Sequence, residues 1–152
     1  MKKFLLIATA FVIGLSVSAQ EKADDIIKLK TEKFDFGKIK QGTPVTTYFE
    51  FTNTSDKPVV IESAVASCGC TTPEYAKEPV APKATTKIKV GYNAASPGAF
   101  NKNVTVKLAG VTDTKVLLIT GEVLDAAAYD TYVKQNSGPK TKAAAAKTTK
   151  GS

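Results

Sequence analysis

Hydrophobic and polar residues alternate along most of this chain with a period of two, not with the 3.6-residue period of a helix. Alternate side chains of an extended strand point to opposite faces, so the pattern predicts strands with one buried face. The side chains expected to point inward are Phe34 and Phe36; Val45, Thr47, Phe49 and Phe51; Val59, Ile61 and Val65; Ile88, Val90 and Tyr92; Val104, Val106 and Leu108; and Val116, Leu118 and Thr120.

Turn-forming residues separate these segments at short intervals, at residues 40–44, 53–58, 81–83, 96–98 and 109–113. Their glycine, proline, asparagine and aspartate are typical of β-turns and loops. We therefore expect an all-β fold, an immunoglobulin-like antiparallel β-sandwich of about seven strands. The sequence has no tryptophan, and its two cysteines are too close together to bridge two sheets. Branched aliphatic and aromatic side chains must form the core.

Residues 1–19 have the pattern of a secretory signal peptide. Lys2 and Lys3 precede an apolar run, and Val17-Ser18-Ala19 is a small-residue cleavage site before Gln20. The run is shorter than the roughly 20 residues of a membrane-spanning helix, and no cysteine stands at the cleavage site to carry a lipid. We expect a periplasmic or secreted protein, cleaved near Ala19, without a membrane span and not a lipoprotein.

The basic charge of the chain lies mainly at its two ends. The formal net charge is +7, but the lysines between Gln20 and Val133 equal the acidic residues in number. The central segment is thus formally neutral, and the chain has no arginine, the residue that best reads phosphates and guanine. We therefore expect no nucleic-acid partner.

The same division predicts the organisation of the chain. We expect a leader over residues 20–30, one sandwich domain over 31–124, and a short segment over 125–133 in which Tyr129 and Tyr132 cap the core or face a partner. Residues 134–152 contain no aromatic or branched aliphatic residue. They are expected to form a disordered Lys/Ala-rich tail, with electrostatic contact to an anionic surface as the alternative.

Both cysteines lie in the segment Ser67-Cys68-Gly69-Cys70-Thr71-Thr72-Pro73. Two residues apart on a strand, Cα atoms are ~6.5 Å from each other, at the upper limit for a disulfide, and a bend at Gly69 would bring Cys68 and Cys70 into range. The residues leave three states open: an exchange-prone disulfide, two packed thiols, or a thiolate pair that binds a soft ion such as monovalent copper. Cys68 and Cys70 are the only candidate metal ligands of this type, and Gly69, Thr71, Thr72 and Pro73 would support the loop.

Enzyme chemistry finds little support in the residue types. The chain has no histidine to act as a base beside a thiolate. Asp24-Asp25 lies in the expected leader and Glu74 and Glu78 in one loop, so we interpret both pairs as solvated acids and not as an acid/base pair. We expect no catalytic residues and no cofactor. We interpret the glycines Gly37, Gly42, Gly98 and Gly121 as conformational, and the glycosylation triplet Asn53-Thr54-Ser55 as a β-turn.

Several motifs, taken in order, resemble one known family, the secreted bacterial family catalogued as domain of unknown function 1573. The resemblance runs from about Thr31 to Leu124, and it departs from the family at Pro82-Lys83-Ala84, where members commonly have Pro-Gly before the next strand. The motifs that carry it are Phe34-Asp35-Phe36-Gly37-Lys38-Ile39, Phe49-Glu50-Phe51-Thr52-Asn53-Thr54, Ser67-Cys68-Gly69-Cys70-Thr71-Thr72-Pro73, Val90-Gly91-Tyr92 and Ile119-Thr120-Gly121-Glu122-Val123.

The family is similar to the immunoglobulin-like domains of major sperm protein and Hydin. The resemblance therefore implies a secreted, non-enzymatic binding or scaffolding module, and we expect its partner to be another secreted or envelope protein that it engages through a sheet edge or end loops. The alternative is a periplasmic thiol module, in which the Cys-Gly-Cys motif serves disulfide exchange or copper binding.

Overall fold

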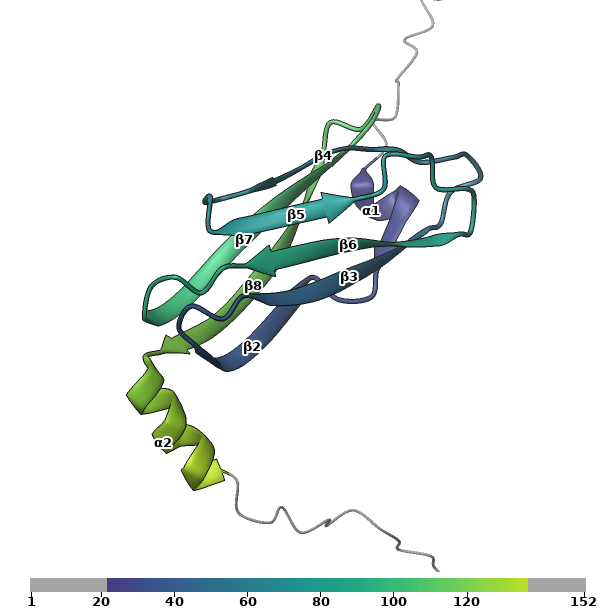
Figure 1. Cartoon of the computed structure of the whole chain (residues 1–152). Helices are drawn as coiled ribbons and strands as arrows, with labels where there is room; N and C mark the ends of the chain where they lie inside the picture. Colours follow the sequence, from purple (N-terminus) through teal and green to yellow (C-terminus); the bar gives the residue numbers. More distant parts are fainter. Residues whose placement is uncertain (1–21, 137–152) are drawn as a thin grey trace, which may run out of the picture.

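A computed structural model describes residues 22–136, which form two four-stranded sheets packed face to face (Figure 1). The expected signal peptide and most of the expected tail lie outside the described residues. The strand order of the first sheet is β1 (Ile27–Leu29), β3 (Val45–Asn53), β6 (Thr85–Tyr92), β5 (Thr71–Tyr75). That of the second sheet is β2 (Lys33–Lys40), β8 (Thr114–Leu124), β7 (Gly98–Leu108), β4 (Ile61–Ala66). Helix α1 (Ala23–Ile26) precedes β1, and α2 (Ala126–Asn136) follows β8.

The immunoglobulin-like β-sandwich is confirmed, with one departure from a purely antiparallel arrangement. Strand β2 pairs with β8 in parallel, while the other neighbouring strands of both sheets run antiparallel. The reason lies in the chain path, because β2 continues the direction of β1 without a reversing turn. The chain thus changes sheets between Leu29 and Lys33 and enters the second sheet at the end where β8 also begins.

The sandwich begins earlier than the expected boundary at residue 31. Ala23, Ile26 and Ile27 are buried, and β1 pairs with the end of β3. The expected leader therefore supplies a helical turn and a strand. The sequence did not predict these elements, because α1 and β1 are short and the charged pair Asp24-Asp25 interrupts the apolar residues.

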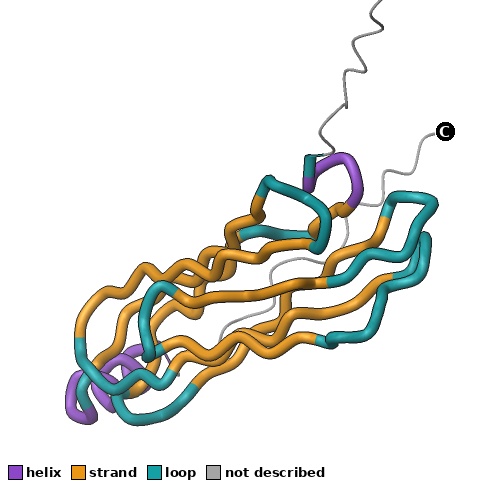
Figure 2. The backbone as a smooth tube through the Cα atoms, turned by 90° about the horizontal axis from the view of Figure 1, so that it is seen from above, coloured by secondary structure: helices purple, strands orange, loops and turns teal. Residues whose placement is uncertain are grey.

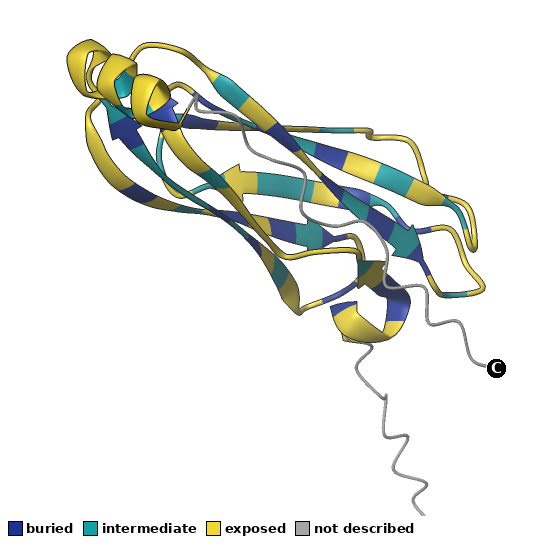
Figure 3. Cartoon of the chain, turned by 90° about the horizontal axis from the view of Figure 1, so that it is seen from below, coloured by how far each residue is buried: buried dark blue, intermediate teal, exposed yellow. Residues whose placement is uncertain are grey.

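The inner faces of the two sheets form one hydrophobic core. Figure 3 shows buried and exposed bands alternating along the strands. Each large apolar side chain that is fully buried stabilises the fold by about 1.5 to 3 kcal/mol. The residues that were correctly predicted to be buried are Thr47, Phe49, Phe51, Val59, Ile61, Ile88, Val90, Tyr92, Val104, Val106 and Leu108.

The inward face was predicted wrongly for the end of β4. The pairing of β4 with β7 shifts between Ile61 and Ser63, so that one extra residue enters β4. This bulge turns Val65 outward, where it is 61% exposed, while Ala64 and Ala66 pack against the core.

Strand β8 also presents the opposite face from the one predicted. Leu117 and Ile119 are buried, whereas Val116 is exposed and Leu118 is half-buried. Four consecutive apolar residues fit either register, so alternation could not choose between the two faces. Phe34 was predicted to be inside and is instead 38% exposed, because it lies on the edge strand β2.

Gly121 has a packing role in β8 and does not form a turn. A Cβ atom there would lie 2.7 Å from Cζ of Phe100 and 2.9 Å from the carbonyl oxygen of Gly37. The Phe100 ring in turn stacks on Tyr92, with ring centroids 4.1 Å apart. Only a glycine lets Phe100 and the β2 backbone approach β8 this closely.

Asn53, at the end of β3, organises the end of the sandwich that lies near α1. Its amide is fully buried and donates to the carbonyl oxygens of Lys57 and Val80 at 2.8 and 2.9 Å. Its Oδ1 accepts hydrogen bonds from the backbone N–H and the hydroxyl of Ser55. The expected β-turn is thus a side-chain-centred turn that joins β3 to the chain near Val80.

The turn at Pro82-Lys83-Ala84 keeps the shape that glycine would give it. Lys83 has φ +63°, in the left-handed region that glycine adopts readily. Its backbone N–H donates to the carbonyl of Asn53, and its Nζ donates to the carbonyl of Thr54 at 2.6 Å. These bonds hold the conformation that the missing glycine would have supplied.

Helix α2 lies beside the end of β2 and does not cap the core. No residue of α2 is buried, and Tyr129 and Tyr132 are half-buried. Lys38 Nζ lies 5.2 Å from the ring centroid of Tyr132, and Lys40 pairs with Asp130 at 3.8 Å. The capping interpretation of these tyrosines is therefore wrong, and α2 continues three residues past the expected end at residue 133. Within residues 22–136, no helix is long and apolar enough to cross a membrane.

Candidate functional site at the cysteine loop

Residues 67–70 connect β4 to β5 and so carry the chain from the edge of the second sheet to the edge of the first. Figure 2 shows the loops gathered at the two ends of the sandwich, with the two helices at opposite ends. The cysteine segment lies at the end from which α2 leaves, away from α1 (Figure 1). It is a corner of the molecule and not part of a strand.

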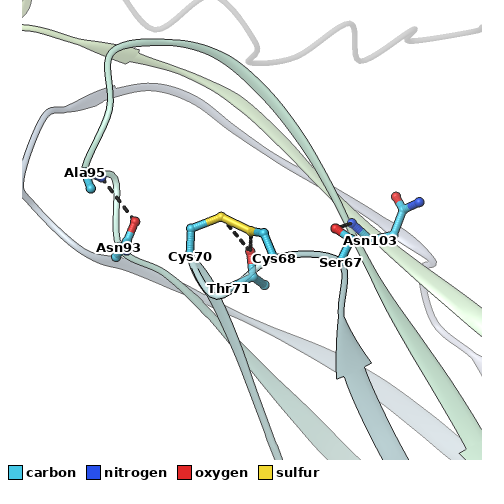
Figure 4. The surroundings of a disulfide bond; sticks show 7 residues. All are labelled: Ser67, Cys68, Cys70, Thr71, Asn93, Ala95 and Asn103. Atoms are coloured by element: carbon cyan, nitrogen blue, oxygen red, sulfur yellow. Dashed lines mark hydrogen bonds between the residues drawn. A yellow bond between two sulfur atoms is a disulfide. The ribbon is translucent and has the colours of Figure 1, made fainter.

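The cysteine segment folds as a tight turn. The backbone N–H of Thr71 donates to the carbonyl of Cys68 at 3.3 Å, which places Gly69 and Cys70 at the centre of the turn. The bend brings the Cα atoms of Cys68 and Cys70 to 5.3 Å, and their Sγ atoms are joined as a disulfide (Figure 4). The geometry thus favours the bridged state among the three that the residues left open.

Hydrogen bonds hold the turn on both sides. On one side, Ser67 N donates to the carbonyl of Asn103 in β7 at 2.9 Å, and Asn103 N donates to the Ser67 hydroxyl. On the other side, Asn93 N donates to the carbonyl of Cys70 at 3.0 Å. Cys68 and Gly69 therefore lie between two residues, Ser67 and Cys70, that hydrogen bonds hold in place.

The two sulfurs have different surroundings. Both cysteines are half-buried, but within residues 22–136 only Cys70 of the pair packs against the hydrophobic core. The hydroxyl of Thr71 lies 3.6 Å from Cys68 Sγ and 3.9 Å from Cys70 Sγ, within reach of a weak hydrogen bond to either. Thr71 is itself buried. A hydroxyl held beside a disulfide can stabilise a thiolate when the bridge opens.

The other expected supporting residues have separate positions. Thr72 and Pro73 continue into β5, with Thr72 exposed and Pro73 half-buried. Gly69 has no positive φ, and a Cβ atom there would meet no other atom within 4 Å. The fold therefore does not require a glycine at this position.

Two neighbouring loops join the cysteine turn in one surface, which we call the cysteine-loop end (residues 41–44, 67–70 and 93–97). Gly42 N donates to the carbonyl of Ala94 at 2.9 Å, and Gln41 Nε2 donates to the carbonyl of Ala95 at 3.0 Å. The bond from Asn93 to Cys70 links this loop pair to the turn. Sequence reasoning missed the link, because it joins residues far apart in the chain.

Ala94 carries backbone strain at the centre of this surface. It has φ +52° although it is not a glycine, and it is fully buried. The left-handed conformation costs roughly 1 to 2 kcal/mol for such a residue. The hydrogen bond to Gly42 and the bond from Ala95 N to Asn93 Oδ1 help to hold it. Strain of this kind is often found where a loop shape serves a function.

The candidate acids do not form a site with the cysteines. Glu74 pairs with Lys89 on the outer face of the first sheet at 3.1 Å, and Asp24 contacts Lys115 at the opposite end. Across residues 22–136, no group of three or more His, Cys, Asp or Glu residues is placed to hold a metal ion. A soft ion would need both thiolates, which exist only after the bridge is reduced.

The fold and this loop define an immunoglobulin-like β-sandwich module with a Cys-Gly-Cys corner. A profile of the family described as "Protein of unknown function (DUF1573)" matches residues 27–123, and the chain belongs to that family. The resemblance drawn from the motifs is thereby confirmed. No curated protein matches the sequence.

Solved structures resemble the sandwich at low sequence identity. A protein of unknown function from Porphyromonas gingivalis W83 has a TM-score of 0.55 at 11% identity, and the match covers 64% of this chain and 46% of the Porphyromonas chain. A PapD-like domain of human CEP192 has a TM-score of 0.58 at 9% identity, covering 80% and 99%. The Vibrio cholerae VesB protease has a TM-score of 0.52 at 14% identity, covering 66% and 33%.

These likenesses show the fold alone. The chain spans less than half of the Porphyromonas protein and about a third of the Vibrio protease. A likeness to part of a protease therefore assigns no activity to this chain. Within the described residues, the cysteine-loop end is where unusual chemistry and unusual backbone geometry coincide.

Proposed function

We propose that this protein is an exported binding or scaffolding module, without catalytic activity of its own, that contacts a secreted or envelope protein through the cysteine-loop end. The observation that carries this proposal is the network of hydrogen bonds between three exposed loops, from Gly42 to Ala94, from Gln41 to Ala95 and from Asn93 to Cys70. A surface ordered in advance loses little conformational entropy on binding. Loops on a rigid sandwich are a common place for recognition.

The sheet edges support this choice, because each edge strand carries a feature that discourages strand addition. Strand β1 has only three residues, and β5 has Pro73 in its middle. The pairing of β4 is bulged after Ile61, and that of β2 shifts between Asp35 and Lys38. Short strands, prolines and bulges are the usual protection of an edge against another strand. The expectation of partner binding through an edge is the weaker of the two.

Export is part of the proposal, and it rests on the pattern of residues 1–19. The test is cell fractionation of the full chain, followed by intact mass of the product. Cleavage after Ala19 and loss of export on deletion of residues 2–15 are expected. Cytoplasmic protein that keeps Met1 through Ala19 would contradict it.

Site-specific photocrosslinking in the native host tests the contact surface. A photoreactive residue at Thr43 or Ser96 would place the probe on the cysteine-loop end, and the same residue at Asp56 or Asp113 would place it at the opposite end; all four positions are exposed. We expect one discrete adduct from the first pair and none from the second. Adducts only from the second pair, or equal adducts from both, would contradict the proposed surface.

A second candidate function is thiol–disulfide exchange with an envelope protein. The observation that favours it is a half-buried Cys68–Cys70 bridge with the Thr71 hydroxyl beside both sulfurs. The test is equilibration with glutathione redox buffers, trapping by alkylation and mass measurement. An exchange module should change from bridged to dithiol within the range that cellular dithiol proteins reach, roughly −120 to −270 mV. A bridge that stays closed throughout would count against exchange, and titration of the dithiol form with monovalent copper tests the metal alternative.

A further inference from the structure

The asymmetry of the two sulfurs gives the exchange reaction a direction. We propose that Cys68 is the sulfur that a partner thiolate attacks and that Cys70 is the leaving sulfur, with Thr71 as a positioning residue. This inference rests on the exchange function proposed above. The occupant of the site is a protein that presents two neighbouring thiols.

The two sulfurs differ in how freely a partner thiolate can reach them. A thiolate attacks a disulfide sulfur in line with the S–S bond, from the side opposite the leaving sulfur. The Cys70 side chain packs against the core, and the Cys70 carbonyl accepts the hydrogen bond from Asn93 N. Core side chains therefore limit the approach of a partner thiolate to the Cys70 sulfur. Cys68 lies in the span between the two anchors and has no equivalent core packing within residues 22–136. Attack on Cys68 therefore displaces less of the fold.

Gly69 keeps the approach open. A Cβ atom there would meet nothing within 4 Å, and the residue is exposed with an ordinary backbone conformation. The folded chain thus tolerates a side chain at a position where a glycine is present. A side chain would extend into the space next to the bridge, where a partner protein must approach.

Thr71 contributes to the departure of Cys70. Its buried hydroxyl lies 3.6 Å from Cys68 Sγ and 3.9 Å from Cys70 Sγ, so that it reaches both sulfurs and can donate a hydrogen bond to the Cys70 thiolate once the bridge opens. A donor beside a thiolate favours the charged form and speeds its departure. No histidine exists in the chain to supply a positive charge in its place.

The exchange balances in two steps. A partner thiolate bonds to Cys68 Sγ, the Cys68–Cys70 bond breaks, and Cys70 takes the electron pair as a thiolate stabilised by the Thr71 hydroxyl. The second partner thiolate then bonds to the first partner sulfur, and Cys68 leaves as a thiolate. The partner dithiol is oxidised to a disulfide, its two protons go to solvent or to the new thiols, and the loop is reduced to a dithiol.

The test compares two matched single variants of the full exported chain, Cys70→Ser and Cys68→Ser. Each leaves one thiol, and the plateau rate of its reaction with a small aromatic disulfide, reached at high pH where the thiolate is fully formed, reports access without the difference in thiolate fraction. We expect Cys68 in the first variant to react about tenfold faster than Cys70 in the second, as accessible thiols do. Equal rates, or a faster Cys70, would overturn the assignment. Thermal unfolding of both variants serves as the folding control.

Thr71→Val tests the positioning role, because it removes the hydroxyl and keeps the shape. In the Cys68→Ser background, the pH profile of Cys70 reactivity should move to higher pH by about half a unit or more, the size expected for the loss of one weak hydrogen bond to a thiolate. An unmoved profile would remove Thr71 from the account, even if overall stability fell.

The behaviour of the wild-type bridge distinguishes a failure of the exchange function from a failure of the assignment of Cys68 as the attacked sulfur. A bridge that no glutathione buffer opens would contradict exchange, whatever the two single thiols do. A bridge that opens while the two single thiols react alike would contradict only the assignment of Cys68. A Gly69→Leu variant adds a steric control, since it should slow a protein dithiol more than a small thiol.

Discussion

The two ends of this sandwich use polar residues in opposite ways. At the α1 end, Asn53 is fully buried, and every hydrogen-bonding group of its side chain is engaged by Lys57, Val80 or Ser55. At the cysteine-loop end, Cys68, Gly69 and Cys70 are half-buried or exposed, and their turn is closed by the disulfide and one long hydrogen bond. The first arrangement stabilises the fold, while the second leaves chemically reactive atoms within reach of a partner.

Burial decides what a short sequence motif can do in the folded protein. Asn53-Thr54-Ser55 has the form of a glycosylation triplet, yet the Asn53 nitrogen that would carry a glycan is committed to two backbone carbonyls inside the protein. The Cys-Gly-Cys segment could equally have been a packed bend. Its position at a corner between two edge strands is what makes a reactive role reasonable.

Replacing Asn53 by alanine should give the largest loss of stability. The carbonyls of Lys57 and Val80 would each lose one of two donors, and the Ser55 backbone N–H would lose its acceptor. Loss of these hydrogen bonds costs about 2 to 4 kcal/mol together. Urea unfolding monitored by circular dichroism measures the change. Asn103→Ala is the matched control, since Asn103 is exposed and begins a second triplet of the same form, Asn103-Val104-Thr105. Similar losses in both variants would show that burial is not the cause.

Gly121→Ala should be the next most costly change. The new methyl group would overlap the Phe100 ring and the carbonyl oxygen of Gly37, and overpacking of this kind costs about 1 to 3 kcal/mol. Near-UV circular dichroism of the Phe100–Tyr92 stack, together with urea unfolding, measures the effect. A neutral result would contradict the close approach between β2, β7 and β8.

Lys115→Met should lower stability at neutral pH by about 1 kcal/mol. Lys115 is 12% exposed and pairs with Asp24 and with Glu32, the latter at 2.6 Å, so that it ties α1 and the β1–β2 connection to β8. The hydrogen bonds to these two carboxylates raise the pKa of Lys115 above its usual 10.5.

The sign of this shift sets the pH dependence. A raised pKa means that the contribution of Lys115 is fully present below pH 10.5 and is lost as the pH rises through the folded-state pKa. The difference in unfolding free energy between wild type and Lys115→Met should therefore be constant from neutral pH to about 10 and shrink above it. A difference that grows above that pH would contradict the assignment.

Gly69→Ala should have the smallest effect on stability, within about 0.5 kcal/mol of wild type, as is usual for surface substitutions that make no new contact. Together with Gly121→Ala it forms a pair of identical substitutions, one at a glycine with open space around it and one at a glycine in close contact. A large loss at Gly69 would mean that the turn, and not access to the bridge, requires the glycine.

The sequence predicted the sandwich because alternation and turn residues are local signals. The prediction of which side chains point inward was wrong where strand pairing contains an extra residue, as at the bulge that turns Val65 outward. It was also wrong where both faces of a strand are apolar, as at Leu117 and Leu118. It also gave no sign that β2 pairs in parallel, since this follows from the path of the chain between two sheets.

The candidate site was predictable only in part. Two cysteines separated by one glycine identified the segment, but the bonds from Asn93 to Cys70 and from Gly42 to Ala94 join loops that lie far apart in sequence. The different surroundings of Cys68 and Cys70 likewise depend on where the core ends. No local pattern contains that information.

The most direct test of the contrast between the two ends is the unfolding free energy of the wild-type protein with the Cys68–Cys70 bridge closed and after its reduction. Closing so small a loop contributes only about 1.5 kcal/mol in the chain-entropy estimate. We expect that the reduced protein stays folded and loses no more than this amount of unfolding free energy, less than Asn53→Ala loses. Unfolding on reduction, or a loss equal to that of Asn53→Ala, would show that the bridge holds the fold together and would contradict a functional role for the cysteine-loop end.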